Sequence, residues 1–492
     1  MGEDGGARGA DSAAIRAELL DGIRRRRPEF EAAGERAEEL RTLPPDVVAT
    51  LREMGVFWLK TPAELGGTPL EPLDFCDVME ELAYADTATA WTVMVGNGGT
   101  GTAGGWLPDA GARRVFAPGR PLPLVIGTPG PRGAGRPVAG GFLVSGRWGF
   151  ASGVAQADWL IAGFRETGDH GRMMVAIVPK EAAEVIDNWR VAGLQGSGSF
   201  DFRLEDVFVP AEMTFERAAS ACRGGALFHQ EAHVFLSNEV PPLCVGMARR
   251  ALDEMTALAS RTVRFPGSAA LSERAVFHAE LGRAETKVRA ARLAHRAAVA
   301  DALAAARASG NTPESVHIAV AAASVYAVET CTEVITDLFR YGGGRVLSLS
   351  SPVQRYLRDA LAARQHIGVS EENYERAGRH RIESWSGQGA GGLWGADSPP
   401  CAGGSRGFVP PGVTVVPPGV RRADAERAGG QGGHRDRRRW RAGLRGVPPA
   451  VRRGLPGGRR GPRRRGGAQG SGGTAGRERL GAGGRRTGRR CR

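Results

Sequence analysis

The residues best suited to ligand chemistry lie in the segment Gly140–Gly153, with the sequence GGFLVSGRWGFASG. Residues 142–145 and 147–150 are extended, largely apolar runs separated by a glycine, a pattern that predicts two short strands. The second run ends in a small-residue turn that contains Ser152, close in sequence to Trp148. A hydroxyl and backbone N–H groups beside a planar indole suit a flat, hydrogen-bonding heterocycle. An ordinary β-turn next to a core tryptophan is the alternative interpretation.

Two other positions could take part in the same chemistry. Residues 196–199 read GSGS, and such a run of small residues lets backbone approach a ligand closely, although a hairpin loop has the same pattern. His366 stands at the predicted end of a helix that begins at Ser351-Pro352. Histidine can donate or accept a proton near neutral pH, and a helix C-terminus favours the protonated imidazole. We therefore expect His366 to be a positively charged hydrogen-bond donor.

Two competing motifs are weak, and a third is absent. Gly96–Gly101 (GNGGTG) matches the dinucleotide fingerprint GxGxxG. That fingerprint opens a helix, and here Gly104-Gly105 and Pro108 follow too closely, so we interpret the stretch as a glycine-rich break where backbone or a ligand packs closely. His229 and His233 have i, i+4 spacing but lack the glutamate of the zinc motif and a third ligand, so no metal site is predicted. No GxSxG sequence supports a serine hydrolase.

The segment GGFLVSGRWGFASG resembles the pattern of flavin-dependent monooxygenases built on the acyl-CoA dehydrogenase fold, the oxygenase components of two-component systems. Matching motifs follow in the same order: Asp158-Trp159, then Gly193–Pro210 (GLQGSGSFDFRLEDVFVP), then Arg358-Asp359-Ala360 followed by His366. The resemblance covers roughly residues 15–382. It implies an α+β fold with an N-terminal helical domain, a middle β domain and a C-terminal four-helix bundle. It also implies a reduced flavin, FMN or FAD, supplied by a separate flavin reductase.

The resemblance assigns the flavin ring to the two small-residue turns. Trp148, Ser152 and Gly153 match the family's flavin-side contacts. The hydroxyl of Ser152 would lie near flavin N5, and backbone N–H groups would face the ring's carbonyl oxygens. Ser197 and Ser199 match a second flavin-side turn. These residues would fix the ring system and adjust its electronic properties.

Other matched positions concern oxygen, phosphate and assembly. His366 would lie beside the oxygen-reactive carbon of the flavin. Arg261 and Arg264 match the positions that hold the flavin's phosphate, often across a dimer interface, and arginine suits bidentate phosphate contact. Gly343, in the turn Tyr341–Gly344, matches a second glycine-rich flavin contact near that interface. We therefore predict a homotetramer.

Two departures from the dehydrogenases of the superfamily favour oxygen chemistry. Ile367-Gly368-Val369 replaces their EGT tripeptide next to His366, and residues 127–133 (GTPGPRG) replace their TExxxGSD stretch. We therefore expect hydroxylation of a small aromatic or polyketide-type molecule. Glu239 could be a displaced base for acyl-CoA dehydrogenation, so that alternative stays open, as does N-oxygenation of a nucleotide-linked amino sugar. The chain has no histidine before His170, so the substrate-contacting histidine of many aromatic hydroxylases is missing.

Hydrophobic periodicity divides the chain into four parts. Residues 1–118 read as a helical domain, within which Thr87–Val95 could be helix or strand. Residues 119–227 alternate strand-like runs with Gly and Pro turns, which predicts a compact β domain. Residues 228–386 carry four long helices with broad apolar faces, as in a bundle. Residues 387–492 are rich in Arg, Gly and Pro without periodicity, so we predict a disordered tail, and we interpret it as a possible frameshift product.

The charge of the 492-residue chain is divided unevenly. The formal net charge is +13, but residues 401–492 hold 24 Arg and 4 acidic residues, which leaves −7 for residues 1–400. The body therefore gives no reason to expect a nucleic-acid partner. Six scattered Cys without a CxxC motif fit a reducing compartment. Without a signal-type N-terminus or a run of 18 apolar residues, we expect a cytoplasmic protein that contacts no membrane.

Overall fold

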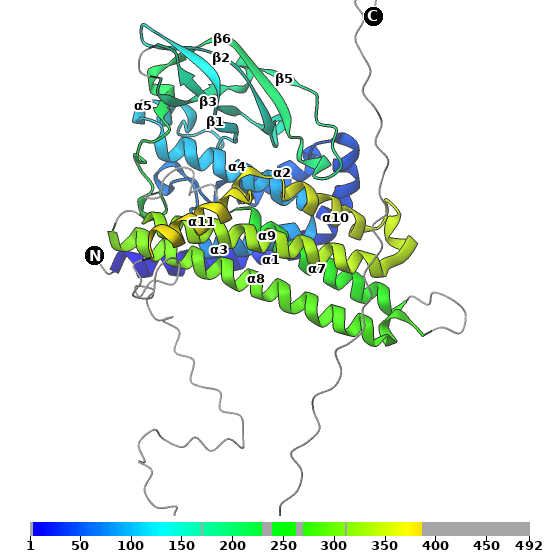
Figure 1. The fold of residues 1–492 in the computed structure, drawn as a ribbon. Coiled ribbons are helices and arrows are strands. Elements are labelled where there is room, and N and C mark those ends of the chain that lie inside the picture. Colours follow the sequence, from blue (N-terminus) through cyan, green and yellow to red (C-terminus); the bar gives the residue numbers. More distant parts are fainter. Residues whose placement is uncertain (1–2, 169–170, 229–238, 262–268, 310–311, 386–492) are drawn as a thin grey trace, which may run out of the picture. The chain divides into compact units, whose positions relative to one another are not determined.

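The computed structural model describes residues 3–168, 171–228, 239–261, 269–309 and 312–385 (Figure 1). N-terminal helices come first, a single sheet follows, and a second set of helices ends the described chain. This order confirms the α+β architecture expected from periodicity. His229, His233, Arg264 and the predicted tail lie outside the described residues.

The N-terminal part is helical throughout. Its helices are α1 (Glu3–Leu40), α2 (Pro45–Glu53), α3 (Pro72–Ala85), α4 (Thr87–Trp106) and α5 (Asp109–Val115), with short 3₁₀ turns η1 (Val56–Trp58) and η2 (Ala63–Leu65). Proline occupies the first position of α2 and α3, where its missing N–H costs nothing. The side chain of Asp86 caps α4 by accepting the N–H of Thr89 at 2.8 Å. The segment Thr87–Val95 is therefore helix and not strand.

The stretch Gly96–Gly101 is not a break but the interior of α4, although the close backbone packing expected there is confirmed. A β-carbon at Gly99 would overlap the backbone carbonyl of Val125, so the missing side chain lets α4 approach the sheet closely. The hydroxyl of Thr100 accepts the N–H of Val125 at 3.0 Å and secures this contact. Glycine lowers helix propensity by about 1 kcal/mol, a cost that close packing of α4 on the sheet offsets here.

The middle part is one seven-stranded sheet with the order β5-β6-β2-β1-β3-β4-β7. Its strands are β1 (Val125–Val138), β2 (Gly141–Ala151), β3 (Trp159–Glu166), β4 (Met173–Pro179), β5 (Glu184–Ile186), β6 (Phe200–Pro210) and β7 (Thr214–Glu216). All neighbouring pairs are antiparallel except β1 with β3. In Figure 1 the sheet lies on one side of the helices, and α4 runs beside it.

One sequence expectation for the sheet is wrong. The runs 142–145 and 147–150 are a single strand, β2, which continues through Gly146. The pairing of β2 with β6 shifts between Val144 and Gly146, where β6 has one residue more than β2, so Gly146 lies opposite a β-bulge of β6 and is not a turn. A side chain there would collide with the ring of Trp148.

The C-terminal helices are α7 (Val240–Ser260), α8 (Ala275–Ser309), α9 (Glu314–Gly342), α10 (Pro352–Ala363) and α11 (Glu372–Glu383). Helix α9 packs against α7, α8 and α10, and α7 also contacts α8 and α10, as in the predicted bundle, while α11 packs on α9. Helix α10 ends at Ala363, three residues before His366, which contradicts the predicted end of that helix. Among the described residues, α4 contacts both the sheet and this bundle, through α7 and α10.

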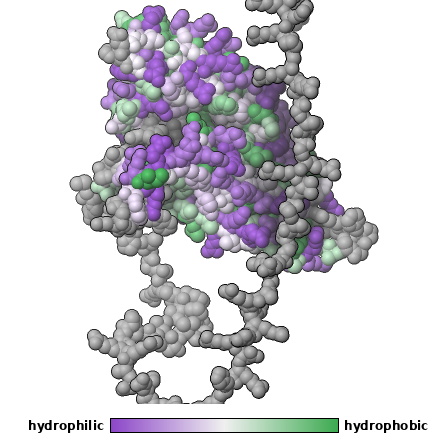
Figure 2. All heavy atoms as spheres, in the orientation of Figure 1, coloured by the Kyte–Doolittle hydropathy of each residue, from purple (hydrophilic) through white to green (hydrophobic). Residues whose placement is uncertain are grey.

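By length and composition one segment, Glu314–Leu347, could cross a membrane. In this structure it consists of α9 and the turn after it, and most of its apolar residues are buried against the rest of the bundle. Figure 2 shows a face of the molecule on which hydrophilic side chains predominate and hydrophobic ones are scattered. The expectation that the protein contacts no membrane stays a prediction.

A buried histidine in α8 gives the bundle a testable pH dependence. His295 is 3% exposed, and its Nε2 has no hydrogen-bond partner among the described residues. Burial, with the charge of Arg296, lowers its pKa to about 4. As pH falls from about 6.5 towards 4, His295 binds a proton in the unfolded chain but not in the folded chain. The free energy of unfolding therefore falls by about 3 kcal/mol.

The substitution His295→Phe should remove this loss of stability on acidification. Urea unfolding between pH 7.5 and pH 4.5 should show the parent weakening relative to the variant as pH falls. The same substitution at the exposed His278 of α8 is the matched control and should leave the pH profile unchanged. If the free energy of unfolding depends on pH in the same way for the parent and for His295→Phe, His295 is not the source of the loss of stability.

Candidate active site

Three serines that the sequence placed in two separate turns form one buried cluster. The Oγ of Ser152 lies 2.6 Å from the Oγ of Ser199, which in turn lies 2.7 Å from the Oγ of Ser197. Each of the three residues is less than 5% exposed. The N–H of Gly153 donates to the carbonyl of Ser197 at 2.8 Å, so the two turns are also joined through their backbones.

The sheet explains why these turns meet. Ser152 directly follows β2, and Ser199 directly precedes β6, which pairs with β2. Ala151 and Phe200 are partners at the last registered pair, so the next residues outward are neighbours. Gly153 has φ of +81°, a conformation that glycine adopts without strain, and it turns the chain back towards α4.

Trp91 of α4 joins this cluster, and the sequence analysis did not identify it. Its Nε1 donates to the Oγ of Ser152 at 3.0 Å. Its ring also meets the imidazole of His366 edge to face, with centroids 5.6 Å apart and planes at 80°. Trp91 therefore connects the serine cluster to the histidine. A tryptophan in an apolar run of a helix gives no sequence signal that distinguishes it from core.

Burial around His366 favours the neutral imidazole, whereas the sequence analysis expected a helix end to favour the imidazolium. His366 lies beyond the end of α10, where the effect of the helix dipole has fallen off. Burial lowers its pKa, because the charged form loses solvation. Its Nδ1 accepts the N–H of Gly368 at 3.2 Å at the start of the turn η10 (Ile367–Val369). The proton of the neutral ring therefore lies on Nε2, which is left as a donor.

Helix α10 also positions the serine cluster. The carboxylate of Asp359 accepts the N–H of Leu194 at 2.6 Å, and Arg358 donates to the carbonyl of Ala192 at 2.8 Å. Burial raises the pKa of Asp359 to about 7, and the Leu194 N–H opposes this rise. A β-carbon at Gly193 would overlap the carbonyl of Arg358, which shows how closely α10 and this loop pack. The motif residues 358 and 359 thus hold the turn that carries Ser197.

Trp148 lies in the core of the sheet. It is fully buried, its Nε1 donates to the carbonyl of Gly163 at 2.7 Å, and its ring stacks on Phe202 with centroids 5.1 Å apart. This packing agrees with the alternative of a core tryptophan, so contact with a flavin stays a prediction for Trp148. The exposed aromatic residue at this end of β2 is Phe150, 66% exposed with φ of +63°, whose ring edge meets Trp189.

The predicted phosphate and interface residues form a separate group at the ends of α7 and α9. Arg261 ends α7 and is exposed, and Arg345 approaches its carbonyl oxygen at 3.5 Å. Gly343 ends α9 with φ of +60° and is exposed. Phosphate contact by Arg261 and flavin contact at Gly343 stay predictions, and Arg264, the other predicted phosphate contact, lies outside the described residues.

Glu239, the possible displaced base, is engaged in a buried ion pair. Its carboxylate accepts from Nζ of Lys60, and both side chains are less than 10% exposed. Lys60 also lies over the ring of Phe75, with Nζ 4.7 Å from the centroid. Burial raises the pKa of Glu239, and the charge of Lys60 opposes that rise. These contacts give Glu239 a structural role, joining the start of α7 to the N-terminal helices.

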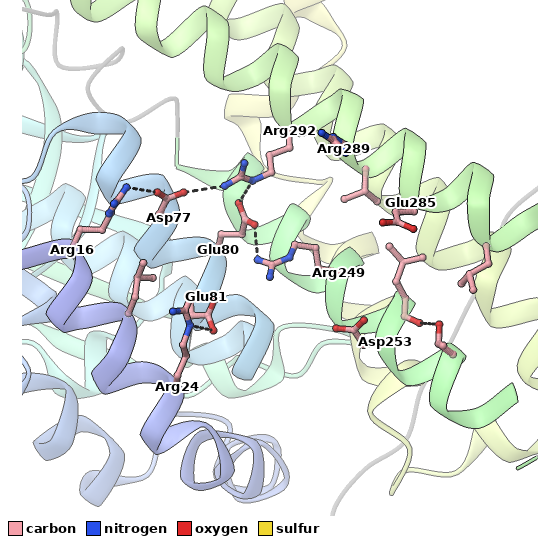
Figure 3. Close-up of a pocket in the computed structure, with 15 residues that line it drawn as sticks. Arg16, Arg24, Asp77, Glu80, Glu81, Arg249, Asp253, Glu285, Arg289 and Arg292 are labelled. Carbon is pink, nitrogen blue, oxygen red and sulfur yellow. Dashed lines mark hydrogen bonds and ion pairs between the residues drawn. The ribbon is translucent and has the colours of Figure 1, made fainter. Parts of the chain in front are cut away.

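A charged cavity of about 890 Å³ lies between α1, α3, α7 and α8 (Figure 3). Asp77 points between Arg16 and Arg292, at 3.1 and 3.0 Å, while Glu80 pairs with Arg292 at 2.7 Å and Arg249 at 2.6 Å. Since these carboxylates and guanidinium groups neutralise one another, we interpret the cavity as an ion-pair network between helices. No group of three or more potential metal ligands occurs in the described part of the chain.

Comparison with known proteins agrees with the order of these elements. Residues 13–103 match the family model described as acyl-CoA dehydrogenase, N-terminal domain, and residues 241–371 match acyl-CoA dehydrogenase, C-terminal domain. The chain is similar to indole-3-acetate monooxygenase of Pseudomonas putida, with 28% identity over 362 residues, which cover 73% of this chain and 91% of that protein.

Two further relatives extend the comparison. FADH(2)-dependent resorcinol hydroxylase, oxygenase component, of a Rhizobium species is 30% identical over 365 residues, covering 69% of this chain and 88% of that protein. The crystal structure of the HsaA monooxygenase from M. tuberculosis matches with a TM-score of 0.69 and 25% identity, over 75% of this chain and 97% of that one.

Proposed function

We propose that this chain, which belongs to the acyl-CoA dehydrogenase superfamily and within it to the flavin-dependent monooxygenase oxygenase components, hydroxylates a small aromatic compound. It uses O₂ and a reduced flavin that a separate reductase supplies. The activities named for the relatives, on indole-3-acetate and resorcinol, support the aromatic substrate class. The site observation that carries the proposal is the meeting of Ser152, Trp91 and His366 between the sheet and α10.

The donor and acceptor set fits a flavin ring. The cluster offers a buried hydroxyl at Ser152, a small-residue turn at Gly153 and a neutral imidazole at His366, all gathered around Trp91. When bound, the reduced flavin supplies the electrons that activate O₂. Polar groups that are already fixed in place and shielded from water can stabilise developing charge at little reorganisation cost.

Each residue of the site then has a defined task. Ser152 holds the edge of the ring system, and Trp91 fixes the hydroxyl of Ser152. His366 presents the Nε2–H of a neutral imidazole, a group that can donate a hydrogen bond or a proton at the reacting oxygen. Burial of the serine cluster keeps bulk water away from this edge. Arg261 is a proposed phosphate contact, and the turn at Gly343 is a further proposed flavin contact.

A homotetramer is the assembly we propose, with a dimer as the smallest active unit. Exposed apolar side chains on the C-terminal helices and their turns support an interface there: Val276, Leu293, Leu347, Leu349 and Ile367. Light scattering coupled to size exclusion should give the mass of four chains. A fully active monomer would contradict this assembly.

The proposed activity is tested by supplying the purified protein with FMN or FAD, a generic flavin reductase, NADH and air. A panel of phenols, indoles and aryl acids should yield at least one product heavier by one oxygen atom, and only when the reductase is present. An acyl-CoA panel serves as the comparison. Stoichiometric, tightly bound oxidised flavin that an acyl-CoA reduces would overturn the proposal in favour of a dehydrogenase.

A further inference from the structure

Five charged side chains meet where α1, α4 and α10 approach one another. Helix α1 contributes Glu38, the N-cap of α4 contributes Asp86, and α10 contributes Arg355, Arg358 and Asp359. Asp86 and Asp359 are buried, and the side chain of Arg355 is 12% exposed. Burial raises the pKa of Asp359, and the negative charges of Asp86 and Glu38 raise it further. Three carboxylates therefore share two guanidinium groups in a place that water reaches poorly.

Hydrogen bonds hold two members of this group. Arg358 donates to a carboxylate oxygen of Glu38 at 2.8 Å. Asp86 accepts the N–H and the hydroxyl of Thr89 at 2.8 and 2.7 Å, which caps the first turn of α4. Trp91 stands in the second turn of the same helix. A displacement of Asp86 would therefore be passed on to Trp91.

Arg355 is placed by charge and by packing. Its Nε has no hydrogen-bond partner in the described part of the chain and lies 3.9 Å from Oε2 of Glu38. A β-carbon at Gly34 of α1 would overlap Nη1 of Arg355 and would lie 2.9 Å from Oδ1 of Asp86. The guanidinium and this carboxylate therefore border the same space, which the missing side chain leaves open. Burial raises the pKa of Asp86, and the hydrogen bonds from Thr89 and the charge of Arg355 oppose that rise.

The charge of Arg355 thus acts between the two helices that carry the site. Without it, three carboxylates would surround the single guanidinium of Arg358. A buried carboxylate that loses a nearby cation takes up a proton or moves towards water. Either response weakens the attraction between the start of α4 and α10. Since α10 ends three residues before His366, these two helices bring the rings of Trp91 and His366 together.

We infer that Arg355 is a positioning residue, whose charge holds the capped start of α4 against α10 and so sets the contact between Trp91 and His366. Its effect on the reaction rests on the proposed function, whereas its effect on this contact does not. Because a charge acts here and not a fork of hydrogen bonds, lysine should replace arginine. Gly34 leaves the room that the guanidinium needs.

Fluorine NMR of the full chain labelled with 5-fluorotryptophan follows this contact without flavin or substrate. The resonance that disappears in Trp91→Phe belongs to Trp91. In Arg355→Met this resonance should shift, and the yield of hydroxylated product per NADH should fall about tenfold, because small misplacements of reacting groups are costly. Arg355→Lys should keep the resonance of the parent and most of its yield. Gly34→Ala, which displaces the guanidinium, should act like Arg355→Met.

Arg292→Met is the matched control, because Arg292 also pairs with two carboxylates, Asp77 and Glu80, but between α3 and α8. It should lower the free energy of unfolding and leave the Trp91 resonance and the yield unchanged. The inference is overturned if Arg355→Met keeps the parent resonance, if Arg355→Lys shifts it as the Met variant does, or if the resonance shifts while the yield stays the same. If the resonances behave as expected but the parent hydroxylates no compound, the proposed function fails and the positioning of Trp91 by Arg355 stands.

Discussion

Replacing His366 by Ala is expected to leave binding of reduced flavin within about twofold and to lower the yield of hydroxylated product per NADH at least tenfold. The missing yield should be recovered as H₂O₂. The reason is that the imidazole of His366 lies against the ring of Trp91, which binds Ser152, and a positioned acid or base contributes about 10² to 10⁴ in rate. Oxygen consumption, product and peroxide are measured together. His278→Ala, on the exposed face of α8, is the control and should give the same yield of product per NADH as the parent.

The pH dependence of the same yield separates a neutral donor from a charged one. Because burial lowers the pKa of His366, its titration lies below the usual range of histidine, and the yield should change little as pH rises from 6.5 to 8.5. A charged imidazole near its usual pKa would lose its proton there, and the yield would fall. A parent whose yield falls in this range while the His366→Ala yield does not would contradict the neutral assignment.

The second large effect concerns stability. Lys60→Met should lower the free energy of unfolding by about 3–5 kcal/mol, because it leaves the buried carboxylate of Glu239 without its ion-pair partner. The pKa of Glu239 is already raised by burial, so the cost should shrink as pH falls and the carboxyl takes up a proton. The double variant Lys60→Met with Glu239→Leu removes both charges and should recover much of the loss.

Urea unfolding at pH 8 and pH 5 measures these effects. Lys287→Met is the matched control, since Lys287 pairs with Glu333 at 3.4 Å on the surface, where ion pairs contribute little. If the double variant is no more stable than Lys60→Met alone, the pair is not the source of the effect. If Lys60→Met has the same free energy of unfolding as the control variant, the buried ion pair does not stabilise the fold as we infer.

Most helices and strands could be predicted from hydrophobic periodicity, because most of them bury one face in a regular pattern. The ambiguous stretch was α4, which is buried almost throughout and therefore shows no alternation of either period. Its glycines resembled a break because propensity alone disfavours them inside a helix. The reason for them, the close approach of Gly99 to Val125, depends on a strand 26 residues away.

The contacts between the residues of the site could not be predicted from the sequence. Ser152, Ser197 and Ser199 were identified, but not that they bond to one another, since 47 residues separate Ser152 from Ser199. Trp148 was assigned to the flavin side with Ser152 through the family resemblance, and this stays a prediction, while the tryptophan that contacts Ser152 is Trp91, 61 residues away. The charge expected for His366 assumed that the predicted helix continued to it, while α10 ends at Ala363 and burial lowers the pKa of His366.

The central claim is that this chain transfers one atom of O₂ to an aromatic substrate by means of diffusible reduced flavin. Its most direct test is mass spectrometry of the product formed under ¹⁸O₂ in ordinary water, with reduced flavin supplied by the reductase. The account predicts a product heavier than the substrate by one ¹⁸O atom, with little ¹⁶O at the new position. A product whose new oxygen is ¹⁶O from water, or turnover of the substrate under argon, would contradict it.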